Sequence, residues 1–229
     1  MLGFKHIVYM GLVLLVTAVL HVLIKKRRID FENMLKVCAL IAVTLDPLYW
    51  FWEHRHFGAF RYETTLPLYI CSLFWILIPI IAFSKKKGNL YRASLSCVTT
   101  VVYYGGIMGL IFNYHVSNHP FFGFVVQRSL FYHFLMFMIV TLMWSTGYYR
   151  VQKKDTYLFF VPLLVLMLPA FAVDWIYGYD YCYFNGGKGT VFEYFSKMLG
   201  TPLFVVLLYG LMFLSIHFVL KALHKKHSK

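Results

Sequence analysis

The sequence predicts an all-α integral membrane protein: a single domain over residues 1–229 that forms a bundle of seven transmembrane helices. Composition gives the first reason, because 60% of the 229 residues are hydrophobic and the mean hydropathy is +0.66. A soluble domain of this size does not carry so much apolar surface. The second reason is the layout, in which apolar runs of about 18–22 residues alternate with short polar connectors. The runs are continuous, which favours helices over strands with alternating faces.

Each run is taken as a helix because roughly 20 helical residues cross a hydrocarbon core of about 30 Å. The first run is longer than the apolar region of a typical secretion signal and has no small-residue cleavage site. It is followed by the basic stretch Lys25–Arg28, so a retained helix is expected. The predicted helices are Phe4–Ile24, Leu35–Trp52, Leu66–Ser84, Ala93–Asn113, Ser129–Tyr149, Tyr157–Tyr177 and Pro202–Leu223.

Proline and glycine predict local features inside these helices. Pro47 can kink the second helix and Pro79 the third, and the sixth contains two further prolines. Gly105 and Gly109 form a G-x-x-x-G pattern in the fourth helix, which indicates close packing against a neighbouring helix rather than chemistry. No internal repeat is evident, which counts against carriers built from repeated halves.

The distribution of basic residues predicts the orientation. Of the 22 Lys and Arg residues, 16 lie in the connectors after the first, third and fifth helices or in the C-terminal tail, and six lie on the opposite side. The positive-inside rule then places the N-terminus outside and the C-terminus in the cytoplasm. The net charge of +13 therefore indicates contact with anionic lipids, and no nucleic-acid partner is expected. The predicted location is the cell membrane, with membrane lipids as partners.

Polar groups inside the predicted helices gather toward the outer side. Ionisable side chains in a bilayer are costly and commonly mark functional sites. At a rise of 1.5 Å per residue, Cys71 and His133 each lie about 7–8 Å below the outer end of their helices. By the same count Asp174 lies about 5 Å and Asp46 about 9 Å below. Four groups on four helices are thus expected in one layer.

A thiol near an imidazole is the minimum set for nucleophilic acyl transfer. The imidazole of His133 would take the proton of Cys71, and the thiolate would attack an ester carbonyl to give a thioester. Asp46 or Asp174 could orient the imidazole. Phospholipid esters lie at about this depth, and the favoured site needs neither a metal nor another cofactor. The alternative is that Cys71 is a small packing residue and His133 an interhelical hydrogen-bond partner.

Other readings of the polar residues stay open. Arg61 and Arg128 can hold a lipid phosphate or serve as interfacial anchors. A non-catalytic carrier or binding protein would use Asp46 and Asp174 to line a cavity. A zinc-dependent hydrolase would use histidines of the outer connectors with a nearby carboxylate, although their spacing fits no defined ligand motif. These residues are Glu53, His54, His56, His115 and His119.

Several short segments resemble a known family. Leu66–Ser72, which reads L-P-L-Y-I-C-S, resembles the L-P-L-x-x-C signature of the YwaF family of bacterial integral membrane proteins. Pro120–Gln127 followed by His133 resembles the second motif of that family. The remaining similarity lies in Asp174-Trp175, in Gly178–Phe184 and in Leu199–Pro202.

The YwaF family is similar to a eukaryotic group of seven-helix proteins described as phospholipid acyltransferases. The resemblance therefore implies that Cys71 is the nucleophile and His133 the general base. The chain departs from the family at four positions. Tyr69 stands where the family often has His, Phe134 where it often has Gly, and Asp174 and Asp180 where it has Asn.

Overall fold

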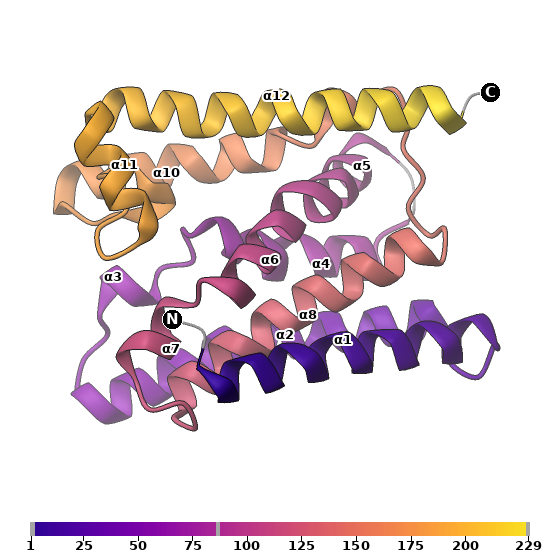
Figure 1. Ribbon diagram of the computed structural model, residues 1–229, viewed down its shortest axis with the longest axis horizontal. Helices are drawn as coiled ribbons and strands as arrows, with labels where there is room; N and C mark the ends of the chain where they lie inside the picture. Colours follow the sequence, from indigo (N-terminus) through magenta and orange to yellow (C-terminus); the bar gives the residue numbers. More distant parts are fainter. Residues whose placement is uncertain (1–2, 86–87, 228–229) are drawn as a thin grey trace.

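The computed structural model describes residues 3–85 and 88–227, and all regular structure within these ranges is helical. Lys86, Lys87 and Lys229, which were counted among the basic residues, lie outside them. Helices run along the long axis of the molecule, and the two termini lie toward opposite ends (Figure 1). The prediction of an all-α protein is therefore confirmed.

Six helical stretches among the described residues are long and apolar enough to cross a membrane. This confirms the prediction of a multi-pass integral membrane protein. Two of the stretches are interrupted: α5 and α6 flank a π-helical turn, Val98–Val102, and α9 and α10 are separated by two residues. The stretches consist of α1 (Phe4–Lys25), α2 (Phe31–Phe57), α5 (Gly88–Cys97) with α6 (Tyr103–Ile111), α8 (Phe124–Ser145), α9 (Asp155–Leu158) with α10 (Val161–Tyr177), and α12 (Thr201–His227).

The predicted helix Leu66–Ser84 is wrong in its first part. Leu66 has an extended backbone, with φ −67° and ψ 135°, because the ring of Pro67 excludes the residue before it from the helical region. Helical structure resumes only in a 3-10 turn, Ile70–Ser72, which leads into α4 (Leu73–Phe83). The apolar helix Ile70–Phe83 is shorter than the other six.

Other boundaries also differ from the prediction. Helix α2 continues to Phe57, where Gly58 ends it in the left-handed conformation. Helix α8 begins five residues before the predicted start, at Phe124. The long connectors contain the short helices α3 (Tyr62–Thr65), α7 (Tyr114–Asn118) and α11 (Val191–Leu199). All three lie at one end of the molecule, here called the α3–α7–α11 end (Figure 1).

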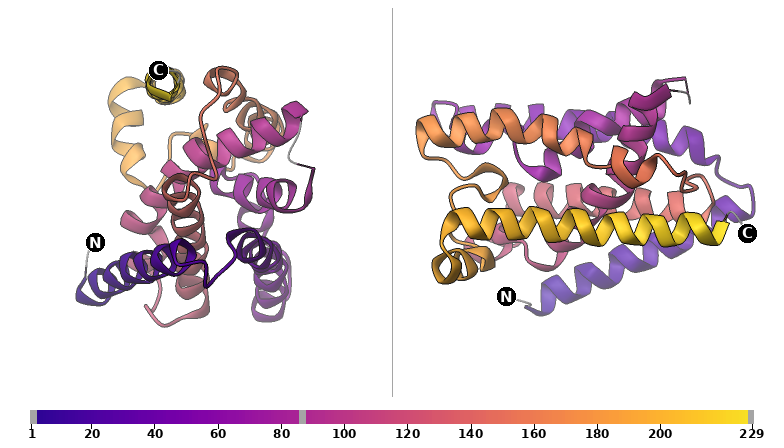
Figure 2. Two further views of the ribbon diagram at one scale, coloured as in Figure 1. Left: turned by 90° about the vertical axis from the view of Figure 1, so that its right-hand side faces the viewer. Right: turned by 90° about the horizontal axis from the view of Figure 1, so that it is seen from above.

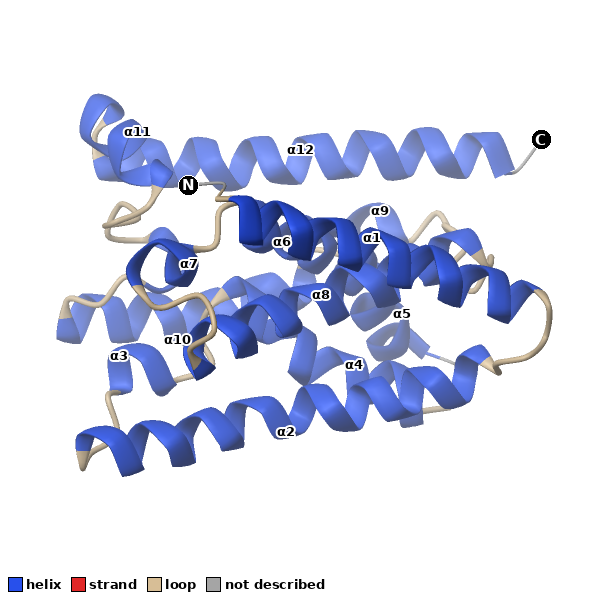
Figure 3. Ribbon diagram, turned by 60° about the horizontal axis from the view of Figure 1, so that its bottom comes forward, coloured by secondary structure: helices blue, strands red, loops and turns tan. Residues whose placement is uncertain are grey.

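Helix α8 is central to the bundle. It packs against α1, α2 and α6 (Figure 3), and its side chains Leu130, Met136, Ile139 and Leu142 are fully buried. Helix α12, by contrast, packs mainly against α9 and α11 and lies along one edge (Figure 2). The core that positions the polar groups is therefore built around α8.

A buried ion pair holds the opposite end together. The guanidinium of Arg92 on α5 pairs with the carboxylate of Asp155 on α9, which is 0% exposed. Asp155 also accepts hydrogen bonds from the Tyr149 hydroxyl at 3.2 Å and the Gln152 amide at 2.8 Å. Arg92 donates further to the Arg150 carbonyl at 3.1 Å. Arg92, which the charge count treats as a connector cation, is thus a neutralised structural residue.

Removing one partner of this pair leaves a buried charge without compensation. We expect Arg92→Met or Asp155→Asn to destabilise the fold by about 3–5 kcal/mol, measured by thermal unfolding in detergent. The exposed Lys153→Gln removes a charge from the same loop and is expected to change stability by less than about 0.5 kcal/mol. Equal effects of Arg92→Met and Lys153→Gln would contradict a structural role for the pair.

Candidate active site

An ion pair between α2 and α8 anchors the polar residues near the α3–α7–α11 end. Arg128 Nη2 contacts Asp46 Oδ1, and Asp46 is 5% exposed. The guanidinium carbon lies 4.5 Å from the ring centroid of Tyr49 and 5.9 Å from that of Tyr132. Arg128 Nε is buried without a protein partner. The structure therefore joins two predicted site residues, Asp46 and Arg128, to each other.

A buried carboxylate continues this polar cluster. Glu53, which is 0% exposed, accepts hydrogen bonds from the hydroxyls of Tyr49 at 3.2 Å, Thr64 at 2.5 Å and Thr65 at 3.1 Å. Tyr49 thus touches both the Arg128 guanidinium and Glu53. These hydrogen bonds tie α2 to α3, the short helix that precedes residues 66–72, here called the Cys71 segment.

Tyr132 on α8 fixes the backbone of the Cys71 segment. Its hydroxyl accepts a hydrogen bond from the Trp75 amide and donates one to the Cys71 carbonyl, both at 3.2 Å. These two backbone groups are four residues apart, so a regular α-helix would pair them directly. The hydroxyl replaces that bond at the start of α4, which is how a side chain inserted into a helix distorts it. The ring of Tyr132 is buried, with its centroid 5.7 Å from that of Phe74.

His133 is held in one orientation by two neighbours. Its Nδ1 lies 2.7 Å from the Ser129 carbonyl oxygen. A carbonyl only accepts hydrogen bonds, so Nδ1 carries the proton and the neutral ring presents the lone pair on Nε2. On the other side lies Gly109 of α6, where any Cβ would overlap the imidazole ring. A neutral imidazole with its lone pair on Nε2 is the form that a general base requires, and here Nε2 lies against Gly109.

Helix α6 packs closely on α8 through Gly109 of the predicted glycine pattern, but not through Gly105. The contact positions are Gly106 and Gly109, whereas a Cβ on Gly105 would meet nothing closer than a Met136 carbon at 4.0 Å. A Cβ on Gly106 would lie 3.0 Å from the Met136 Cβ. Gly109 also decides where the His133 ring can lie, a role that the pattern alone did not indicate.

The structure changes the depths that were counted from predicted helix ends. His133 lies nine residues after the start of α8, about 13–14 Å along its axis, and Asp46 eleven residues before the end of α2, about 16–17 Å. The distances from the helix ends therefore differ from the counted ones, and it is side-chain contacts that relate the predicted residues to one another. Across the described ranges no hydrogen bond joins Cys71 Sγ to the His133 ring, and Tyr132 is the residue that links the two segments.

Asp174 belongs to a second polar group, at the end of α10. Its Oδ1 accepts a hydrogen bond from the Tyr181 amide at 2.9 Å, while Oδ2 is buried without a protein partner. The following residues, Cys182 and Tyr183, have left-handed backbones with φ of 50° and 61°. Two such residues in succession are strained, and strain of this kind is concentrated at functional sites.

Three hydrogen bonds hold the strained turn against α12, the Cys71 segment and α3. The Tyr209 hydroxyl donates to the Cys182 carbonyl at 2.5 Å, and Cys182 Sγ donates to the Leu68 carbonyl at 3.1 Å. The Tyr181 hydroxyl donates to the Tyr62 carbonyl of α3. Burial, with smaller contributions from Asp174 and Cys71, raises the pKa of Cys182 to about 12. Cys182 is therefore a neutral thiol at physiological pH.

Arg61 and the connector histidines occupy separate places. The exposed Arg61 guanidinium lies 5.2 Å from the Phe57 ring centroid. His54 and His56 contact aromatic rings, with centroids 4.9 Å from Phe60 and 5.0 Å from Trp52. In the part of the chain that the structure describes, no three His, Cys, Asp or Glu side chains are grouped to hold a metal ion.

His115 and His119 lie together on α7 and just after it. Their ring centroids are 5.8 Å apart. Burial, and to a lesser degree His119, lowers the pKa of His115 to about 4. The half-buried ring is therefore neutral at physiological pH.

These features define a multi-pass α-helical membrane protein with two polar groups beside a broken helix. The chain belongs to the TMEM164 family, which matches residues 1–220. No curated protein and no solved structure matches it. The family assignment confirms the prediction of a membrane protein family, while the resemblance to the YwaF family and its acyltransferase relatives stays a prediction.

Gly109 and Gly105 provide a matched test of the His133 position. Gly109→Ala is expected to displace the imidazole or separate α6 from α8, and to destabilise the fold by about 1–3 kcal/mol. Gly105→Ala adds the same methyl group on the same helix with ordinary contacts. It is expected to be neutral or to stabilise by up to about 1 kcal/mol. Thermal unfolding in detergent measures both, and equal tolerance of the two substitutions would refute the contact.

Tyr132→Phe removes only the bridging hydroxyl. The Trp75 amide and the Cys71 carbonyl then lose the hydroxyl that bridges them, and the fold should lose about 1–3 kcal/mol. The Trp75 amide should also lose protection from hydrogen exchange, so the peptide that contains it should exchange faster. Tyr104→Phe, at a residue that is 53% exposed, is the control and should change neither quantity.

Proposed function

We propose that this protein is a membrane acyltransferase that moves an acyl chain between lipids, with Cys71 as nucleophile and His133 as general base. One observation carries the proposal. Tyr132 holds the Cys71 segment through its hydroxyl, and the next residue, His133, donates from Nδ1 to Ser129, which leaves the lone pair on Nε2 at the side of the ring that faces Gly109. The resemblance of Leu66–Ser72 to the YwaF signature supports the same pair, and so does the implied kinship with acyltransferases.

The reaction would proceed in two steps. His133 Nε2 takes the thiol proton of Cys71, and the thiolate attacks the ester carbonyl carbon of a phospholipid. The ester C–O bond breaks, the leaving lysolipid oxygen takes the proton from the imidazolium, and a thioester remains. The hydroxyl of an acceptor lipid then attacks the thioester while His133 removes its proton, and the thiol is regenerated. The thiol must approach Nε2 for this, and catalytic hydrogen bonds commonly tighten only in the substrate complex.

We infer that the short apolar helix Ile70–Phe83 completes a set of seven crossings, with the N-terminus outside. The termini at opposite ends of the molecule support an odd number of crossings (Figure 1). Segments rich in Lys and Arg, at the α1–α2 turn and after α8, lie away from the α3–α7–α11 end. The extended residues 66–69 would then lie at membrane depth, where irregular backbone is tolerated when protein covers it.

A binding or carrier function is the alternative that one observation favours. Asp174 Oδ2 is buried without a protein partner, so a bound cationic group or a proton would satisfy it. This function needs no thiol, and Cys71 would be dispensable. It also predicts that Asp174→Asn weakens ligand binding, whereas acyl transfer through Cys71 does not require the charge of Asp174.

An acyl-transfer assay separates the two. Purified protein in liposomes is given a phospholipid with a labelled acyl chain and a lysophospholipid acceptor. Cys71→Ala is expected to reduce transfer to background, and His133→Gln to reduce it by about 10²–10⁴-fold. Cys38→Ala removes another thiol, one that is buried on α2, and should keep the wild-type rate. Full transfer by folded Cys71→Ala would exclude the proposed mechanism.

A further inference from the structure

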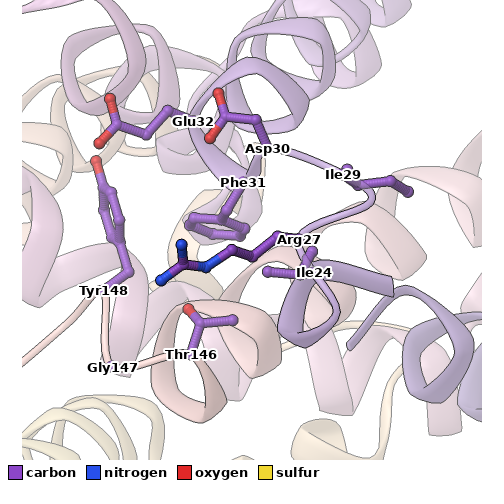
Figure 4. A pocket seen from close by; sticks show the side chains of 9 residues that line it. All are labelled: Ile24, Arg27, Ile29, Asp30, Phe31, Glu32, Thr146, Gly147 and Tyr148. Carbon is purple, nitrogen blue, oxygen red and sulfur yellow. The ribbon is translucent and has the colours of Figure 1, made fainter. Parts of the chain in front are cut away.

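A cavity of about 530 Å³ lies at the end of the molecule remote from the candidate active site, between the α1–α2 turn and the segment after α8. Its lining includes Arg27 and two carboxylates, Asp30 and Glu32 (Figure 4). Charges of both signs line it, so the cavity favours neither an anion nor a cation. A sharper indication of a ligand comes from a buried hydrogen-bond donor close to Cys71 in the chain, the indole of Trp75.

The indole of Trp75 on α4 has a buried Nε1–H group without a hydrogen-bond partner among the described residues. A buried indole N–H normally finds an acceptor, because an unpaired donor loses its hydrogen bonds to water and gains none. Trp144 on α8 follows this rule, since its Nε1 donates to the Thr99 carbonyl at 3.2 Å. The Trp75 donor therefore needs an acceptor that the described protein does not supply.

Trp75 lies one helical turn after Cys71 in the helical stretch Ile70–Phe83. The Tyr132 hydroxyl bonds to the Cys71 carbonyl and the Trp75 amide, and so fixes the two residues relative to each other. Side chains four residues apart share one helix face, with about 5–6 Å between their Cβ atoms. Long side chains on a helix also lean toward its N-terminus, which directs the Trp75 indole over the turn that contains Cys71.

The acceptor that fits this donor is uncharged. An indole N–H carries no charge, and the guanidinium of Arg128 is already neutralised by Asp46. A phosphate buried at this place would lack compensation, whereas the carbonyl oxygen of an ester needs none. An ester carbonyl is also the group that Cys71 attacks in the proposed reaction.

We propose that Trp75 Nε1 binds the carbonyl oxygen of the lipid ester and stabilises the negative charge that forms on it, a role that rests on the proposed acyl transfer. When the Cys71 thiolate bonds to the carbonyl carbon, the electron pair of the C=O double bond moves to the oxygen. The indole donates a hydrogen bond to this oxyanion and keeps its proton. The pair then returns to the carbon, and the bond to the leaving lysolipid oxygen breaks.

Replacing the indole at position 75 with benzothiophene, in which sulfur takes the place of the N–H, tests this role. The ring and its edge-to-face contact with Trp50, 6.4 Å between centroids, are kept, and only the donor is lost. In the liposome assay with a labelled phospholipid and a lysophospholipid acceptor, the rate is expected to fall about 10²–10³-fold. The Tm in detergent should equal or exceed the wild-type value, because no protein hydrogen bond is removed.

The same replacement at Trp144 is the matched control. It removes an N–H that has a protein partner, so the Tm should fall by about 2–4 °C while acyl transfer keeps the wild-type rate. A phospholipid analogue with a trifluoromethyl ketone in place of the ester measures binding without turnover, since the Cys71 thiol adds reversibly to that carbonyl. Its apparent Kd should weaken about tenfold or more when the Trp75 donor is removed.

The assay separates failure of this role from failure of the acyl transfer itself. Wild-type transfer without the Trp75 donor, while Cys71→Ala is inactive, would overturn the role of Trp75 and leave the thioester mechanism standing. Full transfer by Cys71→Ala, or wild-type protein that neither transfers acyl chains nor binds the ketone, would overturn both. A fall in Tm as large as that of the Trp144 control would show that Nε1 has a structural partner and would also overturn the role.

Discussion

The polar chemistry of this protein depends on the ion pair between Asp46 and Arg128. A guanidinium and a carboxylate in an apolar bundle are each costly, so they are tolerated because they neutralise each other. The pair fixes α2 against α8, and the aromatic rings of Tyr49 and Tyr132 lie around the guanidinium. Tyr49 leads to Glu53 and α3, and Tyr132 leads to the Cys71 turn. Loss of the pair would therefore affect both segments.

Tyr132 and His133 show how one helix serves two neighbours. Adjacent residues on α8 point in different directions, so the tyrosine reaches the start of α4 and the histidine faces Gly109 on α6. The Tyr132 hydroxyl accepts from one backbone group and donates to another, which leaves Cys71 at the junction between a 3-10 turn and α4. Backbone geometry that departs from a regular helix at this place is a consequence of that inserted hydroxyl and of Pro67.

Much of the architecture could be predicted from hydropathy, because a bilayer requires long apolar helices. The broken start of the third predicted helix could not be located by hydropathy alone, since Leu66–Tyr69 is apolar but Pro67 prevents helix formation. Helix ends also differ: α8 begins at Phe124, an apolar residue that the sequence reading assigned to a connector. The counted depth of His133 changed for this reason.

The sequence predicted the ionisable residues of the candidate site but not the uncharged residues that position them. Asp46 and Arg128 were each singled out, yet only the fold shows that they pair, because pairing across helices leaves no spacing in the sequence. Tyr132 carries no charge and was missed, and Gly109 was assigned to helix packing without its contact to His133. Their signals were present, since one precedes His133 and the other completes a glycine pattern, but an apolar packing role explained both equally well.

The most direct test of the account is the mass of the intact protein after incubation with a defined phospholipid. Acyl transfer through Cys71 predicts an added mass equal to one acyl chain, which hydroxylamine removes and which Cys71→Ala does not acquire. An adduct that persists in Cys71→Ala would contradict this account. Transfer between lipids at the full rate by folded Cys71→Ala would contradict it equally.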